Sequence, residues 1–308
     1  VENSIIKRKT NKMWIKKGLV IEPDKNLWWN QSHGMLPTVQ HLEGDQYKVF
    51  YSGRDKDNVS HIGYSIIEVK DDTITEISKS DEPIMSPGER GCFDDNGITP
   101  SSIQGQKMYY IGWNSGTTTT RMSLIMGMAK ETGGVYERVS RAPLMPKTNK
   151  EPFGICTAPY VIKDGNVYKM WYVSGNGWID KDLPKYDIKY ATSQDGYTWN
   201  RDGITSLPLE EGETALARPC VFRGDFLFHM YFSYKDPAIG YRIGYATSTD
   251  GIVFNRHLDS DNCLSVSESG WDSEMVEYSF VFEHKGRRFM MYNGNNYGEN
   301  GIGYAVKQ

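Results

Sequence analysis

The chain has 308 residues, of which 38% are hydrophobic, 24% charged and 13% aromatic, with a formal net charge of −4. This apolar content excludes a disordered chain, and the 20 Tyr, 8 Trp and 31 Gly disfavour a helix bundle, in which Ala, Leu and Lys would dominate. The mild negative charge argues against a general nucleic-acid binder, which usually has a basic face.

The N-terminal segment, residues 1–17, is basic and lacks the apolar core of a signal peptide. Nowhere does the chain contain 18 consecutive apolar residues, so no transmembrane helix is predicted. We therefore expect a cytoplasmic protein without a membrane partner, unless a signal has been removed. The four cysteines, at positions 92, 156, 220 and 263, form no CxxC pair and are expected to be free thiols rather than zinc ligands.

One pattern of a short apolar strand, a polar turn and an aromatic strand occurs five times along the chain. The copies begin near residues 35, 98, 157, 217 and 276. We align them on Pro37, Pro100, Pro159, Pro219 and Tyr278, which follow one another at intervals of 59 to 63 residues. A nearly constant period of this length is the signature of a repeat architecture.

Each copy continues with a third strand, predicted near residues 61–66, 121–129, 187–193, 242–248 and 301–306. A turn follows, most clearly at Asp195-Gly196 and Asp250-Gly251, and Asp-Gly is a strong hairpin signal because Gly tolerates positive φ. A fourth strand then carries an aromatic residue, Trp199 or Phe254. Four antiparallel strands in about 60 residues are typical of a propeller blade.

The last copy stops after its third strand, and the N-terminal segment supplies the missing fourth. Residues 13–21 match the fourth-strand pattern, with Trp14 in the place of Trp199. We therefore predict an all-β fold, a single five-bladed β-propeller domain over residues 1–308, in which residues 13–21 close blade five and remove an open sheet edge. The alternative is two unrelated β-sandwiches.

In such a ring, the starts of the first strands and the ends of the second strands converge on one axial opening, the usual place for a ligand. The aromatic-Asp pairs at Asp94 and Asp272 recur in the repeat and are expected to be structural, as are the turn residues Asp195 and Asp250. Non-repeated polar residues are better candidates for function. The substrate-binding candidates are His33, Arg54, Asn96, Trp113, Asn114, Thr157, Asn176, Arg218, Tyr234 and Asn293.

The five copies, the Gly-Trp/Phe-Asp…Pro start and the ATSxDGxxW hairpin resemble the five-bladed propeller glycosidases of glycoside hydrolase families 43, 32, 62, 68, 117 and 130. The resemblance covers essentially the whole chain, but its motifs specify the blade more than the activity. It implies that a carboxylic acid donates a proton to the leaving oxygen, while a second carboxylate activates water or attacks the sugar.

The chain departs from the carboxylate pattern of these families. Family 43 places an Asp beside the first anchor Pro and a Glu in the third blade, but residues 32–38 (SHGMLPT) and 155–160 (ICTAPY) contain neither. The Trp-x-Asn-Asp-Pro signature of family 32 is also missing. We therefore expect a different catalytic set, drawn from Asp95, Glu274 and Glu277, or a loss of the hydrolytic chemistry.

The function expected from these features is a glycan-active enzyme, a glycoside hydrolase or transglycosylase that acts through carboxylates in the axial funnel. One alternative is a carbohydrate-binding or sugar-modifying propeller without hydrolysis. Another is a phosphate-dependent glycoside phosphorylase, in which Arg54, Arg121, Arg218 and His33 would hold phosphate. All three imply a carbohydrate or sugar-containing small molecule as partner, and no nucleic acid.

No cofactor is expected. An axial cation could be held by His33, His61, Asp95 and Glu277, but no metal-binding spacing such as HExxH occurs, so no metal ligands are assigned.

Overall fold

The computed structural model describes residues 13–258 and 261–308; residues 1–12, expected above to belong to the same domain, lie outside them. The described residues form strands β1 to β20 and the short element α1 (Asn295–Gly298), so the predicted all-β class is confirmed. Within these ranges, α1 is far too short to span a membrane.

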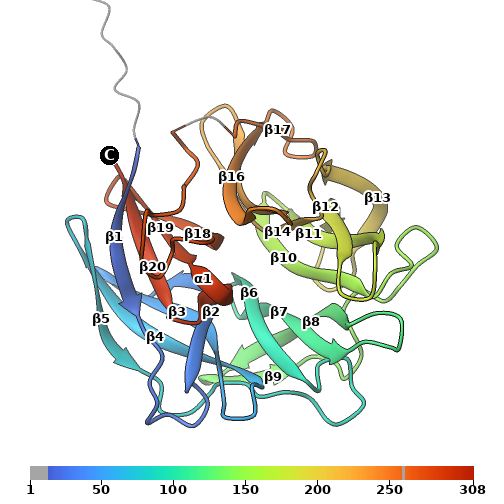
Figure 1. Cartoon of the computed structure of the whole chain (residues 1–308), viewed down its shortest axis with the longest axis horizontal. Coiled ribbons are helices and arrows are strands. Elements are labelled where there is room, and N and C mark those ends of the chain that lie inside the picture. Colours follow the sequence, from blue (N-terminus) through green and yellow to red (C-terminus); the bar gives the residue numbers. More distant parts are fainter. Residues whose placement is uncertain (1–12, 259–260) are drawn as a thin grey trace, which may run out of the picture.

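The strands pair antiparallel in groups of four that follow the chain (Figure 1). The first group is β2 (Ser32–His41), β3 (Gln46–Arg54), β4 (Ser60–Lys70) and β5 (Thr73–Lys79). The second is β6 (Gly97–Gln104), β7 (Lys107–Ser115), β8 (Met122–Thr132) and β9 (Val135–Arg138). The third is β10 (Ile155–Asp164), β11 (Val167–Trp178), β12 (Pro184–Ser193) and β13 (Asn200–Leu207). The fourth is β14 (Ala215–Arg223), β15 (Phe228–Asp236), β16 (Gly240–Ser248) and β17 (Asn255–Arg256).

The last group joins the two ends of the described chain. It consists of β18 (Glu277–His284), β19 (Arg287–Asn293), β20 (Ile302–Lys307) and β1 (Trp14–Ile21). As expected for the N-terminal segment, β1 runs antiparallel to β20, with Trp14 opposite Lys307 and Ile21 opposite Ile302. The Trp14 indole also donates a hydrogen bond to the Asn262 carbonyl at 2.7 Å. The edge of β20 is therefore covered by the N-terminal strand.

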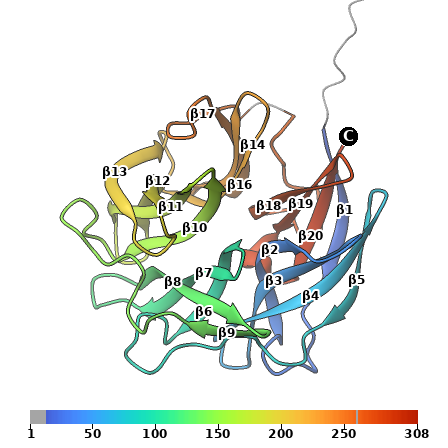
Figure 2. The same ribbon diagram turned by 180° about the vertical axis from the view of Figure 1, so that it is seen from behind.

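The innermost strands of these groups form a closed circuit. Strand β2 contacts β6, β6 contacts β10, β10 contacts β14, β14 contacts β18, and β18 contacts β2. Figures 1 and 2 show the same ring from its two faces, with the other strands of each group fanning outward. One-residue or two-residue parallel bridges such as Ser60–Gly97 join the first four groups into a 16-stranded sheet.

A bulge recurs in the innermost strands. In β2, β10, β14 and β18, two residues stand opposite one residue of the next strand, and the first of the two has positive φ: Leu36, Ala158, Arg218 and Tyr278. Pro follows the first three, and Ser279 follows Tyr278. The predicted fifth anchor at Tyr278 is therefore wrong by one residue, because the backbone register aligns Ser279 with the prolines. Glu277 is then equivalent to Met35, Thr157 and Ala217.

A hydrogen-bonded network ties each group to the loop that precedes it. In the second group, the buried Asp94 carboxylate accepts hydrogen bonds from the Tyr110 hydroxyl at 2.9 Å and from Arg138 Nε at 2.8 Å. The same pattern recurs as Tyr172–Glu151–Arg201 and Tyr292–Asp272–Lys16. These contacts support the structural role expected for Asp94 and Asp272, through side-chain partners on the second and fourth strands.

The predicted Asp-Gly turns occur between the third and fourth strands of their groups. The Asp195 carboxylate accepts hydrogen bonds from the Tyr197 and Thr198 amides, and Gly196 has φ +76°. Asp250 accepts from the Ile252 amide in the same way. The fourth strands begin one residue later than predicted, since Trp199 and Phe254 immediately precede β13 and β17.

Candidate functional site

The innermost strands all begin at one end of the ring, which we call the mouth. The loops before β2, β6, β10, β14 and β18 open there, together with the ends of β3, β7, β11, β15 and β19. The short element α1 follows β19, contacts β2, and lies near the centre of the ring in Figure 1. Two of its residues, Asn296 and Tyr297, have positive φ, so α1 is a strained turn rather than a regular helix.

Glu277, the first residue of β18, is the most unusual group at the mouth. Its side chain has no exposed surface, and neither carboxyl oxygen has a hydrogen-bond partner in the part of the chain that the structure describes. Burial raises the pKa of Glu277 well above its usual value, and the positive charge of Lys235 opposes this only in part. Buried carboxyls are normally paired, so an unpaired one in an opening marks a functional candidate.

Tyrosines surround Glu277. The hydroxyl groups of Tyr186 and Tyr241 lie 2.8 Å apart, and the Tyr241 ring lies 5.7 Å from the Tyr278 ring and 6.3 Å from the Tyr297 ring. Burial, with smaller contributions that include the Glu277 charge, raises the pKa of Tyr186 to about 12. Tyr297 is 39% exposed, so the group extends from the buried carboxyl to the protein surface.

Basic side chains complete this group. The Lys235 ammonium lies 5.4 Å from the centre of the Tyr241 ring, in the register pair that joins β15 to β16. Arg54 stands opposite Ser32 in the β2–β3 pair, next to His33. The His33 amide donates a hydrogen bond to the Glu299 carbonyl just after α1, at 3.3 Å. We name as the mouth cluster Glu277, Tyr186, Tyr241, Tyr278, Tyr297, Lys235, Arg54 and His33.

His33 makes the protein sensitive to acid. Burial, and then the Arg54 charge, lower the pKa of His33 from 6.5 to about 4, although Glu299 opposes this. Because the folded-state pKa is depressed, the unfolded state binds the proton first, and stability is lost as the pH falls from 6.5 towards 4. Between pH 7 and 4, we expect the wild type to lose about 1–2 kcal/mol more than His33→Asn, allowing for partial exposure.

Urea denaturation at pH 7 and pH 4 measures this difference. Asn tolerates the positive φ of His33, so the variant keeps the local backbone. His41→Asn, at the exposed far end of β2, is the control. Equal losses in wild type and His33→Asn would contradict the assignment.

Four of the residues expected from the sequence lie together in the second group, on the rim of the mouth. The Asp95 carboxylate accepts hydrogen bonds from the Gly91 amide at 2.7 Å and from Asn114 Nδ2 at 2.7 Å. The Asn96 side-chain oxygen accepts from the Ser115 amide. These contacts brace the loop before β6, whereas the neighbouring Trp113 ring remains 37% exposed.

Other expected residues differ in how available they are. Glu274 and Asn176 are exposed, and Tyr234 is half-buried. The backbone of Glu274 is held by Asn295 Oδ1 and by Arg242, but no contact restrains its carboxylate among the described residues. Thr157 is buried at the position equivalent to Glu277, and its hydroxyl has no partner in the described chain.

Two residues expected to bind substrate have structural partners instead. Asn293 accepts a hydrogen bond from the Leu36 amide and donates to the carbonyls of Gly34 and Gly301, which uses its whole amide. Arg218 is 1% exposed and donates only to groups of β2 and β6. This geometry assigns both side chains to the scaffold, because their polar atoms face other strands rather than the mouth.

The sequence did not single out the tyrosines or Lys235 of the mouth cluster. One signal was present, since Tyr186 and Tyr241 both stand two residues before an Ile in the third strand of their groups. A second repeated signal was also missed: an aromatic residue precedes the basic residue of the structural network by two positions, as in Trp14–Lys16, Tyr136–Arg138 and Trp199–Arg201.

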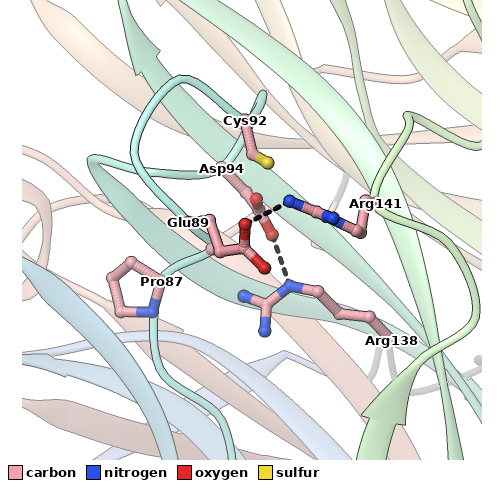
Figure 3. A pocket seen from close by; sticks show the side chains of 7 residues that line it. Pro87, Glu89, Cys92, Asp94, Arg138 and Arg141 are labelled. Carbon is pink, nitrogen blue, oxygen red and sulfur yellow. Dashed lines mark hydrogen bonds and ion pairs between the residues drawn. The ribbon is translucent and has the colours of Figure 1, made fainter.

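A cavity of about 170 Å³ lies away from the mouth, between the loop before β6 and the segment after β9 (Figure 3). Arg138 and Arg141 line it, but Arg138 is paired with Asp94 and Arg141 with Glu89. Its walls are therefore satisfied ion pairs. The described residues hold no cluster of three or more His, Cys, Asp or Glu that could bind a metal ion, and their four cysteines are free.

Comparison with known proteins identifies relatives of this chain. No family model matches it. Two proteins of Mycobacterium tuberculosis, described as "Uncharacterized protein MT1551" and "Uncharacterized protein Rv1502", are each 38% identical over 300 residues, which cover 95% of this chain and 98% of theirs. The chain belongs to the same family as these two proteins. This family therefore shares the sequence over nearly the whole ring.

Solved structures of similar fold are glycoside hydrolase propellers, as the resemblance in sequence predicted. A structure described as "Glycoside hydrolase" has a TM-score of 0.73 at 18% identity, covering 97% of this chain and 92% of its own. The RGII complex of BT0996 has 0.72 at 17%, over 96% and 92%. A thermostable family-43 glycoside hydrolase has 0.64 at 15%, over 90% and 88%. At these identities the likeness establishes the fold alone.

Proposed function

We propose that this protein is a glycan-active enzyme, a glycoside hydrolase or transglycosylase, in which Glu277 donates the proton to the leaving oxygen. The ring that carries the site is, in this proposal, a single five-bladed propeller domain. The observation that supports the activity is the buried, unpartnered carboxyl of Glu277 among the tyrosines of the mouth. A carboxyl whose pKa is raised by burial keeps its proton near neutral pH, as a general acid requires.

The second carboxylate of a hydrolase must lie on the same opening. Glu274 is our candidate, because its exposed carboxylate has no partner among the described residues and its backbone is fixed beside the start of β16. Asp95, the other sequence candidate, is engaged with Gly91 and Asn114 and is proposed to brace the loop. Of the expected sugar-binding residues, we retain His33, Arg54, Trp113 and Thr157.

The site must open before it can act. Glu277 is closed to solvent, whereas an acid catalyst must lie within hydrogen-bond reach of the substrate oxygen. Tyr297 is the exposed ring of the mouth cluster and stands on the strained turn α1. We propose that substrate displaces this ring and reaches the carboxyl beneath it.

A glycoside phosphorylase is the second candidate. A phosphorylase needs one carboxylic acid and a bound phosphate that replaces the second carboxylate. Only Glu277 among the carboxyls of the mouth is buried without a partner in the described residues, and Arg54 and Lys235 lie near it as cations. This arrangement supplies the acid and the charges that phosphate would need.

Assays of nitrophenyl glycosides and oligosaccharides, with and without an excess of phosphate, test the proposal. We expect turnover by the wild type and loss of activity in Glu277→Gln. A hydrolase would be active without phosphate and impaired in Glu274→Gln, whereas a phosphorylase would require phosphate and tolerate that change. Thermal stabilisation by sugars without turnover of any glycoside would overturn the enzymatic function in favour of sugar binding.

A further inference from the structure

We propose that the mouth binds a sugar that carries an anionic oxygen group, a carboxylate or a phosphate, held between Arg54 and Lys235. This inference rests on the proposed function, because it names the class of substrate for the same site. It depends on which basic side chains of the ring already have acidic partners and which do not.

The basic residues of the structural networks are all paired. Arg138 bonds Asp94, Arg201 bonds Glu151, and Arg256 bonds Glu213, each with a nitrogen-to-oxygen distance of 2.8 Å or less. Lys16 bonds Asp272 in the same way at 2.6 Å. The protein therefore neutralises the half-buried cations that hold its scaffold together.

Arg54 and Lys235 break this rule. Arg54 is half-buried, and in the described chain its guanidinium donates a hydrogen bond to the neutral Asn58 side chain at 2.9 Å and forms no ion pair. The half-buried Lys235 ammonium forms no ion pair among these residues either and lies over the Tyr241 ring at 5.4 Å. Partly desolvated cations without a counter-ion favour an incoming anion.

The two cations flank the buried carboxyl. Lys235 lies within electrostatic range of Glu277, and Arg54 within range of Tyr278 and Tyr297. The Tyr241 ring, 5.7 Å from Tyr278 and 6.3 Å from Tyr297, lies between the two ends. A sugar ring placed against these tyrosines would therefore carry its substituents towards both cations, with its glycosidic oxygen facing Glu277.

The acidic groups near this place do not cancel the charge. Glu277 is favoured in its neutral form by burial. Glu299 lies within range of Arg54 and His33, but it is exposed, and its carboxylate accepts a hydrogen bond from Asn296 Nδ2 at 2.8 Å. His33, with a pKa lowered to about 4, is neutral at pH 7. The net charge of the mouth cluster at neutral pH is therefore positive.

Titration calorimetry with matched small probes tests the inference without relying on catalysis. The probes are methyl glucuronide, glucose 6-phosphate, methyl glucoside and inorganic phosphate. We expect at least one charged sugar to bind about tenfold or more tightly than methyl glucoside, with a preference that falls as salt is raised. Comparing the carboxylate with the phosphate probe identifies which anion the site takes.

The variants Arg54→Met and Lys235→Met should each remove most of this preference while leaving the weak binding of methyl glucoside unchanged. Arg223→Met is the matched control, since Arg223 is exposed at the opposite end of the β14–β15 pair that carries Lys235. Equal affinity for charged and neutral sugars, binding of free phosphate without any gain from the sugar, or no binding at all would overturn the inference.

The two proposals can fail separately. Selective binding of charged sugars without cleavage of any glycoside would sink the proposed enzyme but support the anionic ligand. Cleavage of neutral glycosides by wild type and Lys235→Met at equal rates would do the opposite.

Discussion

Replacing Glu277 by Gln is expected to lower turnover by about 10³-fold and, at the same time, to make the protein relatively harder to unfold at alkaline pH. The loss of activity follows from the proposed role, because an amide has no acidic proton to give. The gain in stability follows from burial alone, since the wild-type carboxyl must either keep its proton or ionise where no partner lies among the described residues.

The sign of the pH effect can be derived from the raised pKa. In the folded state Glu277 holds its proton above the usual 4.5, whereas the unfolded chain releases it. The wild type therefore loses stability as the pH rises from about 4.5 towards the folded-state pKa. The amide of the Glu277→Gln variant does not titrate, so the difference in unfolding free energy should move in favour of the variant by about 1–3 kcal/mol between pH 5 and pH 8.5.

Urea denaturation of both proteins at the two pH values measures this shift. Glu274→Gln is the control for stability, since Glu274 is exposed and its replacement should leave the pH dependence unchanged. A difference between wild type and Glu277→Gln that is the same at both pH values would show that the carboxyl is not held protonated by burial. Full activity in Glu277→Gln would remove Glu277 from the mechanism.

Replacing Arg218 by Met is expected to destabilise the fold by about 3–5 kcal/mol, the largest effect we foresee for a residue outside the mouth cluster. Its guanidinium donates to the Ser101 carbonyl and hydroxyl at 2.5 and 3.0 Å, and to the Pro37 carbonyl and Thr38 hydroxyl, both at 2.7 Å. It thereby connects β14 to β6 and β2, which are not its neighbours in the ring.

The expected cost is large because the partners of Arg218 are buried too. Without the guanidinium, the carbonyls of Pro37 and Ser101 lose their donor, at about 1–3 kcal/mol for each unpaired group. Removal of a buried charge offsets part of this loss. Arg218→Lys should be intermediate, since one ammonium cannot reach both strands with the fork of donors that Arg provides.

Chemical denaturation compares these variants with Arg223→Met, a change of the same kind at the exposed end of the same strand. Arg223 is paired with Asp164 at the surface and should contribute less than about 1 kcal/mol. A loss below about 1 kcal/mol for Arg218→Met would contradict a role across the ring, and selective loss of sugar binding in a stable variant would restore the substrate-binding role expected from the sequence.

The repeat made much of the fold predictable. Pro37, Pro159 and Pro219 locate the innermost strands, and Asp-Gly turns locate the hairpins, because these features depend on local backbone geometry. The pairing of residues 13–21 with the C-terminal strand was also foreseeable, since an incomplete unit at one end requires a complement at the other. The fifth anchor was misplaced because Ser279 replaces the proline that marks the other copies.

The site was less predictable than the fold. Sequence identified Glu277, His33 and Arg54 as polar residues outside the repeat, but treated Asp95, Asn293 and Arg218 in the same way. Their hydrogen bonds distinguish them: Asn293 and Arg218 bond to groups that lie 8 to 259 and 117 to 181 positions away along the chain. No local pattern reveals partners at such separations.

The sequence by itself determined the all-β class, the repeat of strands and the meeting of the two ends, because periodicity and turn chemistry act between near neighbours. Only the tertiary structure decided which carboxyl is left without a partner and which arginine serves as a strut. Burial and charge pairing depend on what the ring brings together, and the ring places tyrosines from β12, β16, β18 and α1 around Glu277 while it satisfies Arg218 with the backbone of distant strands.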